Sequence, residues 1–291
     1  MAALIEAAGH RVELVVIKTG GDRLQERPLS EIGDKRLFVK EIEDALLAED
    51  VDIAVHSAKD MSATLPDGLE IAAVLPREDP RDALVLHAGT TVADFAAALS
   101  HVGETATIAT SSIRRVAQLA GVLPGATFAP IRGNVDTRLR KLDEGGFDAI
   151  VLASAGMRRL GFANRISAAI PLDLCIPAPG QGIVAIEIRA DDDRARAALQ
   201  SAGDAPAAIA LLAERTVVHA LGGGCQLPLG AIAINGGGGL TMHGVVATPD
   251  GKRVIRRSVE GTVSDPAGLG AKLAEELARG GAMEILDAVR R

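Results

Sequence analysis

One of the two cysteines in this chain of 291 residues lies beside a run of glycines, in the stretch LGGGCQLPLG at residues 221–230. Glycine is used where the backbone turns sharply or where another group comes close to it, because it has no side chain. Packing alone gives little reason to place a thiol in such a stretch. We therefore interpret Cys225 as a residue with a chemical role.

A hydroxyl, an ammonium group and a carboxylate follow the apolar run DIAVH at 52–56, as Ser57, Lys59 and Asp60. In open parallel sheets, ligands bind beyond the carboxyl ends of the strands. If residues 52–56 form such a strand, these three side chains lie at the edge of a cleft. The alternative is a helix start that carries surface charges.

Basic and hydroxyl side chains also follow three further apolar runs. Serines at a helix start leave backbone N–H groups free, the helix dipole adds positive charge, and arginine forks suit carboxylate or phosphate. Each segment alone could be solvated surface, but together they predict a ligand with several carboxylates or phosphates. The residues concerned are Thr110, Ser111, Ser112, Arg114 and Arg115, then Arg132, Asn134 and Arg138, and then Arg158 and Arg159.

The charge of the chain is unevenly distributed. The net charge of −7 argues against a nucleic-acid partner. Residues 110–165 nevertheless hold eight Arg and one Lys against three Asp and one Glu. The chain has no Trp or Tyr and only five Phe, so it offers no aromatic platform for stacked bases. The basic region therefore indicates a small anionic ligand.

The sequence lacks the patterns that are typical of several other classes of protein. The glycines match no nucleotide-binding spacing, and His56, His87 and His219 are too far apart in sequence to suggest a metal cluster. No apolar run approaches the roughly 20 residues that span a bilayer, and residues 1–10 lack the pattern of a secretory signal. We expect a cytoplasmic protein with free thiols, no metal site and no membrane partner.

Short β-branched runs alternate with segments of helical spacing, which predicts largely parallel sheets covered on both faces. A helix is expected at residues 38–50. The strands are expected at residues 12–18, 52–56, 71–75, 83–87, 107–110, 148–153 and 183–188.

Two proline-containing segments, 77–89 and 170–182, are interpreted as crossovers between lobes. The predicted fold class is therefore α/β, with two periplasmic-binding-protein-like lobes around a cleft and a small α+β domain at the C-terminus. The expected boundaries are 1–76 with 183–200 for lobe 1, 82–176 for lobe 2, and 205–291 for the third domain.

The third domain is predicted to begin with a helix. Asp204 can cap it, Pro206 suits its first turn, and Gly222 would end it. A turn at 249–251 is expected to join two strands, and Asp265 to open a last helix. The buried side of the first helix is expected to consist of Ile209, Leu212, Thr216 and Val217.

Together, the motifs of this chain resemble the porphobilinogen deaminase family of tetrapyrrole (haem) biosynthesis, also called hydroxymethylbilane synthases. The resemblance runs from about Val12 to the C-terminus in unbroken order. It implies a transferase that condenses four porphobilinogen molecules head to tail, with loss of ammonia, and releases hydroxymethylbilane. The motifs are VDIAVHSAKDMSATLPDGL, REDPRDALV, ATSSIRRVAQL, IRGNVDTRLRKLDEGGFDAIVLASAGMRRLG, PAPGQGIVAIE and GGGCQLPLGA.

The resemblance implies roles for individual residues. Cys225 would carry a dipyrromethane cofactor through a thioether, and Asp60 would be the catalytic carboxylate that stabilises positive charge and moves protons. Each pyrrole bears one acetate and one propionate, which is the anionic ligand that the arginines require. The implied binding residues are Ser57, Lys59, Lys35, Thr110, Ser111, Ser112, Arg114, Arg115, Arg132, Asn134, Arg138, Arg159, Gln181 and Arg215.

The chain also departs from the family pattern. The family opens with a strand and loop resembling RIATRxSxLAxxQ, whereas this chain begins MAALIEAAGHRVEL, so that strand and its arginine and serine are expected to be absent. The GGKG loop of the family reads Gly33-Asp34-Lys35-Arg36 here. Cys175 matches no motif and is expected to be a buried thiol.

Three functional readings follow. The first is an active porphobilinogen deaminase, expected to be a monomer that hands its product to uroporphyrinogen-III synthase. The second is a truncated, impaired member or a non-catalytic anion-binding protein, since two hinged lobes also describe solute-binding proteins. The third is a thiol hydrolase that uses Cys225 and His219. These two side chains would come together only if the loop between them folded in a particular way.

Overall fold

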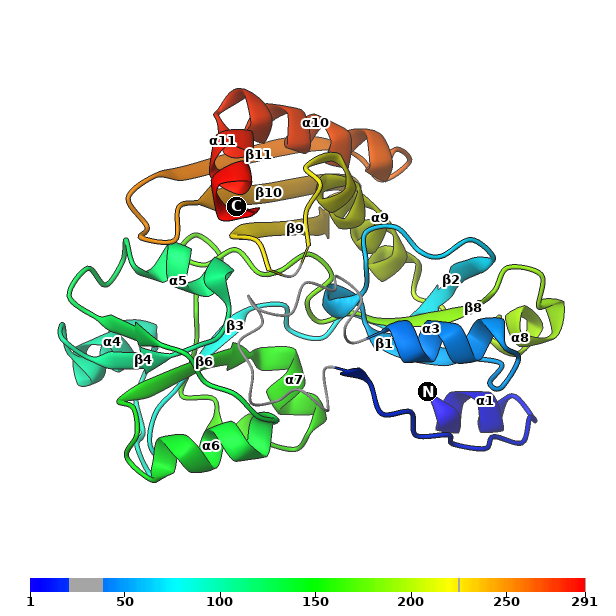
Figure 1. Ribbon diagram of the computed structural model, residues 1–291, viewed down its shortest axis with the longest axis horizontal. Helices are drawn as coiled ribbons and strands as arrows, with labels where there is room; N and C mark the ends of the chain where they lie inside the picture. Colours follow the sequence, from blue (N-terminus) through cyan, green and yellow to red (C-terminus); the bar gives the residue numbers. More distant parts are fainter. Residues whose placement is uncertain (21–38, 225, 291) are drawn as a thin grey trace.

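The structure, a computed structural model, describes residues 1–20, 39–224 and 226–290. Three sheets organise these residues, one for each of the predicted units (Figure 1). The α/β lobes and the sheet-and-helix C-terminal domain predicted from the sequence are therefore confirmed, whereas the exact domain boundaries stay a prediction. Lys35 and Cys225 lie outside the described residues.

Lobe 1 is built on a three-stranded sheet in the order β1-β8-β2. Strand β8 is antiparallel to both of its neighbours, so the prediction of a parallel sheet is wrong for the described part of this lobe. The reason is the second crossover, which returns the chain from lobe 2 and inserts β8 in the opposite direction. The elements are α1 (Ala2–Ala7), α3 (Lys40–Leu47), β1 (Ala54–Ser57), η2 (Ala58–Asp60), β2 (Leu69–Val74), β8 (Val184–Arg189) and α8 (Asp193–Ala198).

The strand predicted at 12–18 does not form. Leu14 and Val16 are 79% and 88% exposed, and residues 12–18 belong to none of the described strands. β-branched residues favour a strand only where a neighbouring strand supplies hydrogen bonds and a packed face. Residues 12–18 have no such neighbour among the described residues, so their sequence preference has no effect.

Lobe 2 contains a five-stranded mixed sheet in the order β5-β4-β6-β3-β7. Successive residues of a strand point to opposite faces. Accordingly, Leu84 and Val151 join one buried apolar cluster, while Val85 and Ile150 join the other. The elements are β3 (Asp82–Val85), α4 (Phe95–Val102), β4 (Thr107–Ala109), α5 (Ile113–Leu119), β5 (Thr127–Ala129), α6 (Val135–Asp143), β6 (Ala149–Ala153), α7 (Ser154–Arg159), η3 (Ala163–Arg165) and β7 (Ala168–Ala169).

The third domain packs helices on the antiparallel sheet β9-β10-β11. The predicted cap is confirmed, since the Asp204 carboxylate accepts a hydrogen bond from Ala207 N at 2.7 Å. Leu212 is half exposed and Leu211 is buried, so the predicted buried face is displaced by one residue there. The elements are α9 (Ala205–Ala220), β9 (Leu229–Gly236), β10 (Gly239–Ala247), β11 (Val254–Thr262) and α10 (Pro266–Arg279), and an unpredicted helix α11 (Ala282–Arg290) follows.

The second crossover lies close both to lobe 1 and to the first crossover. A Cβ on Gly180 would lie 3.0 Å from Lys59 N, and one on Gly182 would lie 2.3 Å from Glu78 O. Both glycines have positive φ, which other residues rarely adopt. These two positions therefore explain why the PGQG stretch contains glycine, and they place the second crossover directly beside residues 58–59.

A buried carboxylate joins both crossovers to the third domain. Glu214 on α9 accepts hydrogen bonds from Arg77 Nη1 at 2.5 Å, from Gly180 N at 2.6 Å and from Ala233 N at 2.8 Å. The side chain of Glu214 is fully buried, and that of Arg77 is 14% exposed. One carboxylate thus fixes both crossovers and β9 to the helix that leads toward position 225.

Glu214→Ala is expected to lower the free energy of unfolding by about 3–5 kcal/mol, because it leaves the Arg77 charge and two backbone N–H groups without their partner. Chemical denaturation measures this change. Glu275→Ala, which removes a carboxylate 62% exposed on α10, is the control and is expected to change stability by less than about 1 kcal/mol. Equal effects of the two substitutions would contradict the assignment.

Candidate functional site

A cavity of about 250 Å³ lies where lobe 1, lobe 2 and the third domain meet. Lobe 1 contributes the short helix η2, lobe 2 contributes the start of α5 together with residues at both ends of the 132–138 segment, and the third domain contributes α9. The predicted site residues that line it are Lys59, Asp60, Ser111, Ser112, Arg114, Arg115, Arg132, Arg138, Gln181 and Arg215. We call this hollow the cationic cavity.

Positive charge dominates the lining of the cationic cavity. Its lining contains six cationic side chains, Lys59 and five arginines, against the single carboxylate of Asp60. Charges held in a partly dry cavity interact more strongly than charges in water. The excess of cations therefore favours the binding of an anionic ligand.

The ammonium group of Lys59 lacks full compensation of its charge in the ligand-free cavity. Burial lowers the pKa of Lys59 from its usual value, and the nearby charges of Arg115 and Arg114 lower it further, while Asp60 and Asp82 act in the opposite direction. Burial disfavours the charged form of a lysine unless an anion compensates it. A carboxylate bound beside Lys59 would provide that compensation.

The 132–138 segment adds a second pair of cations. Burial, together with the charges of Arg115 and Arg132, lowers the pKa of Arg138 to about 10. Arg138 Nε donates a hydrogen bond to Gly133 O at 2.8 Å, which fixes its stem. The Arg132 side chain makes no ion pair with any described residue, and so its charge is available to a ligand.

The third domain and the second crossover complete the lining. Burial lowers the pKa of Arg215, and Arg215 Nη2 donates to Ala63 O at 2.9 Å, which joins α9 to lobe 1. Gln181 Nε2 donates to Pro80 O at 2.7 Å and to Asp82 Oδ1 at 2.9 Å. Both residues therefore join the units around the cavity as well as lining it.

Four predicted residues lie elsewhere. Asn134 caps α6 by accepting from Thr137 N at 2.9 Å, and Arg159 Nη2 donates to Gly182 O at 2.7 Å. Ser57 ends β1, where it pairs with Val184, and Thr110 is buried at the end of β4. None of the four lines the cationic cavity, and their ligand roles stay predictions.

Lys35 and Cys225 lie outside the described residues, but the residues on either side of Cys225 are described. Gly224 and Leu227, on either side of position 225, both line the cationic cavity. Cys175, the other cysteine, is fully buried as predicted. Burial and the neighbouring charge of Asp82 raise the pKa of the Cys175 thiol to about 12, which makes it a poor nucleophile.

Sequence reasoning missed Asp82, the carboxylate on which Arg114 and Arg115 converge. Arg114 Nη1 lies 2.7 Å from Asp82 Oδ2, and Arg115 Nε lies 3.0 Å from Asp82 Oδ1. Burial works to raise the pKa of Asp82, but the charges of the two arginines outweigh it and hold that pKa below its usual range. Its position in PRDALV, among charged residues at a strand start, was the only signal in the sequence.

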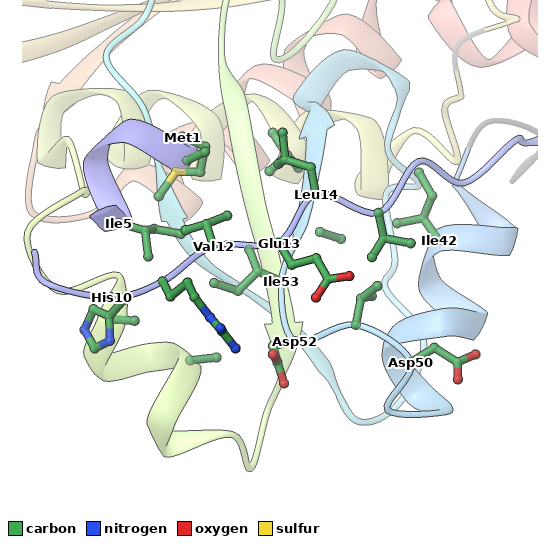
Figure 2. Close-up of a pocket in the computed structure, with 18 of the residues that line it drawn as sticks. Met1, Ile5, His10, Val12, Glu13, Leu14, Ile42, Asp50, Asp52 and Ile53 are labelled. Atoms are coloured by element: carbon green, nitrogen blue, oxygen red, sulfur yellow. The ribbon is translucent and has the colours of Figure 1, made fainter. Parts of the chain in front are cut away.

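A larger hollow of about 770 Å³ lies in lobe 1, away from these residues (Figure 2). It is lined by α1, by the exposed 10–17 segment and by residues 50–55. Apolar side chains such as Ile5 and Ile53 line it (Figure 2). Its charged lining residues are of both signs and include Glu13, Asp52 and Arg11. Because it offers no excess of cations, it does not suit a ligand with several carboxylates.

The described ranges 1–20, 39–224 and 226–290 hold neither a metal-binding cluster nor a membrane-spanning helix. These residues contain no group of three or more His, Cys, Asp or Glu side chains placed to hold a metal ion. No helix in this part of the chain is long and apolar enough to cross a membrane.

Comparison with protein families matches nearly the whole chain in two parts. Residues 1–197 match the family model "Porphobilinogen deaminase, dipyromethane cofactor binding domain". Residues 208–279 match "Porphobilinogen deaminase, C-terminal domain". The order of the two matches follows the division between the two lobes and the third domain.

Curated relatives agree with the family models. A porphobilinogen deaminase from Syntrophobacter fumaroxidans is 46% identical over 284 residues, which cover 97% of this chain and 89% of the relative. One from Roseiflexus castenholzii is 48% identical over 278 residues, which cover 96% of this chain and 89% of the relative.

Among solved structures, the substrate-binding protein of an amino acid ABC transporter gives a TM-score of 0.33 at 14% identity, covering 69% of this chain and 75% of that one. A TM-score at this level does not establish a shared fold.

Proposed function

The chain belongs to the porphobilinogen deaminase family of tetrapyrrole biosynthesis, and on that premise we propose that the cationic cavity is where porphobilinogen is condensed. The observation that carries the proposal is the lining of six cations around one carboxylate, Asp60. A ligand whose every ring bears an acetate and a propionate supplies the missing negative charge. The lowered pKa of Lys59, Arg138 and Arg215 supports the same assignment.

The residues present fit the dipyrromethane cofactor of the family. Its carboxylates match the excess cations of the cavity, and Gly224 and Leu227 bring the chain on both sides of position 225 to the cavity wall. Lys59, Arg132, Arg138 and Arg215 would hold those carboxylates, and Cys225 would provide the thioether. When bound, the cofactor supplies a free pyrrole α-carbon as the nucleophile to which substrate is joined.

Asp60 is proposed as the acid–base residue. Loss of ammonia from porphobilinogen leaves an electron-poor carbon system with developing positive charge, and a fixed carboxylate in a partly dry cavity stabilises it. The same carboxylate can accept the proton that leaves the attacked pyrrole. Asp60 is the only carboxylate in the described lining, so it is the one described anion there that can stabilise the positive charge.

The surrounding cations are proposed to bind and orient the substrate. Ser112 begins α5 without using its side chain as a cap, which leaves its hydroxyl for a ligand in the cavity it lines. Arginine forks hold carboxylates with two hydrogen bonds, which sets the direction of the pyrrole ring as well as its position. The nucleophile and the electrophilic carbon are thereby brought into line beside Asp60.

The experiment that tests the proposal is the intact mass of the purified chain, measured after incubation with porphobilinogen. We expect a mass increase equal to two linked porphobilinogen units in the wild type and in Cys175→Ala, and none in Cys225→Ala. An aldehyde colour reaction for pyrroles, followed by product analysis, then tests turnover to hydroxymethylbilane. A wild-type chain that keeps its bare mass would contradict the proposal and would favour an anion-binding protein without turnover.

The finer expectations about partners are also proposals. We infer a monomer located in the cytoplasm, with hand-over of hydroxymethylbilane to uroporphyrinogen-III synthase as the downstream enzyme. Light scattering during size-exclusion chromatography tests the monomer. Co-elution of the two enzymes, compared with each alone, tests the hand-over.

A further inference from the structure

Asp82, at the first position of β3, lies behind the cationic cavity and does not line it. Two cavity arginines nevertheless converge on its carboxylate, which is fully buried. We propose that Asp82 is a positioning residue, whose single carboxylate fixes Arg114 and Arg115 so that their remaining N–H groups face the ligand carboxylates. The inference rests on the proposed function of the cavity.

Asp82 and the backbone of Ile176 fix the guanidinium group of Arg114. Its Nη1 donates to Asp82 Oδ2 at 2.7 Å and to Ile176 O at 2.8 Å, and its Nη2 donates to Asp82 Oδ1 at 3.2 Å. Its Nε is buried and has no hydrogen-bond partner among the described residues. An unpaired buried donor is costly. Because Arg114 is a lining residue of the cavity, we interpret its unpaired Nε as a donor whose acceptor is supplied when the ligand is bound.

Arg115 is held by the same carboxylate through its oxygen Oδ1. Its Nε and Nη2 lie 3.0 Å and 2.9 Å from Asp82 Oδ1, and its Nη1 donates to Val151 O at 2.8 Å. Each Nη nitrogen carries two N–H groups, so both keep one for a ligand. The plane of this guanidinium, and hence the direction of those donors, is set by Asp82 and β6.

The carboxylate also joins the cavity to the second crossover. Gln181 Nε2 donates to Asp82 Oδ1 at 2.9 Å, and Gln181 O accepts from Arg77 Nε at 3.0 Å. Arginine side chains lose considerable rotamer entropy when they are fixed in one position. Because Asp82 fixes both arginines before the ligand arrives, the ligand does not have to order them.

Charge provides a readout that distinguishes positioning from a purely structural role. Lys59 faces Asp60 on its own element, Asp82 on β3, and Arg114 and Arg115 on α5. Asp82 raises the pKa of Lys59, whereas both arginines lower it. Removing the Asp82 charge therefore lowers the pKa of Lys59 further, and Lys59 loses its proton, and its hold on a carboxylate, at a lower pH.

The first test compares Asp82→Asn with Asp79→Asn. Asp79 is three residues away and pairs with Arg81, which is outside the cavity lining, so its variant is the matched control. We expect Asp82→Asn to raise KM for porphobilinogen at least about 10-fold with a smaller fall in kcat, and to move the alkaline limb of kcat/KM to lower pH. Asp79→Asn should stay within twofold, with an unmoved pH profile. Equal profiles for the two variants overturn the inference.

The second test keeps Asp82 in place and does not depend on the folding of an Asp82 variant. Side-chain nitrogen NMR of the arginines, recorded before and after porphobilinogen is added to the Cys225→Ala chain, reports rotation about the Cζ–Nε bond. We expect Arg114 and Arg115 to be rotationally fixed already before addition, with Arg132 becoming fixed only after it. Freely rotating Arg114 and Arg115 without ligand would overturn the inference even if Asp82→Asn does not fold.

The two proposals fail in different ways. A wild-type chain that takes up no cofactor mass and does not bind porphobilinogen contradicts the proposed function. A wild-type chain that does both, alongside an Asp82→Asn variant that behaves as Asp79→Asn does, contradicts only the positioning role of Asp82.

Discussion

Asp60→Asn is expected to lower kcat by at least about 1,000-fold, which corresponds to about 4 kcal/mol of lost transition-state stabilisation. Asn keeps the shape of Asp60 but can neither stabilise positive charge as an anion nor accept a proton at neutral pH. Asp60 is also the one carboxylate in the described lining of the cationic cavity. Single-turnover kinetics with the cofactor-loaded variant measure the loss.

The control for this prediction is Asp67→Asn, which removes an exposed carboxylate seven residues further along the chain. It is expected to keep wild-type kcat within twofold. Thermal unfolding of both variants should match the wild type, which separates a chemical role from a loss of folding. An Asp60→Asn variant that retains turnover within tenfold of the wild type would contradict the assigned role.

The double substitution Arg132→Gln with Arg138→Gln is expected to reduce kcat/KM by about 100-fold or more and to stall assembly. Arg132 has no ion-pair partner among the described residues, and Arg138 has its pKa lowered to about 10 by burial and by Arg115 and Arg132. The double substitution removes two side chains that are proposed to bind substrate carboxylates. It also relieves the repulsion between like charges in the ligand-free protein. Catalysis should therefore fall without a loss of stability.

The matched control is Arg140→Gln, on the same helix as Arg138. Its side chain is 66% exposed and lies 3.9 Å from Glu144, so its loss should change neither kcat/KM nor stability measurably. Intact mass of the enzyme during turnover, which shows how many pyrrole units remain attached, gives the readout. Normal product formation by the double variant would mean that these arginines are only surface charges.

A different result is expected for Arg114 because of its environment. The sequence groups it with Arg115 and Arg132 as a ligand for pyrrole carboxylates. In the structure, Arg114 is 3% exposed and forms a buried pair with Asp82. Breaking a buried pair destabilises a protein by about 3–5 kcal/mol. Arg114→Ala therefore combines two effects, and Arg132 is the better position at which to test binding alone.

The sequence by itself determined the family, the α/β class and the third domain. Local signals are reliable where one segment contains all the parts of a feature. Asp204 and Pro206, for example, mark the start of α9 within three residues, and Gly222 marks its end. The clustering of Lys59, Asp60, Ser112, Arg115 and Arg138 in one cavity was also predictable, because each of these residues lies between the end of a strand and the first turn of the helix after it.

Only the tertiary structure decided which strands pair and which charges are already neutralised. Residues 12–18 have a strong strand pattern and form no strand, and β8 enters its sheet antiparallel, because pairing depends on neighbours that are distant in sequence. Likewise, Asp82 lies 32 residues from Arg114 and 99 from Gln181 and still receives hydrogen bonds from both. A sequence records the type of each charge, but the field at a site depends on the distance and burial of every charge around it, and those are fixed only when the chain is folded.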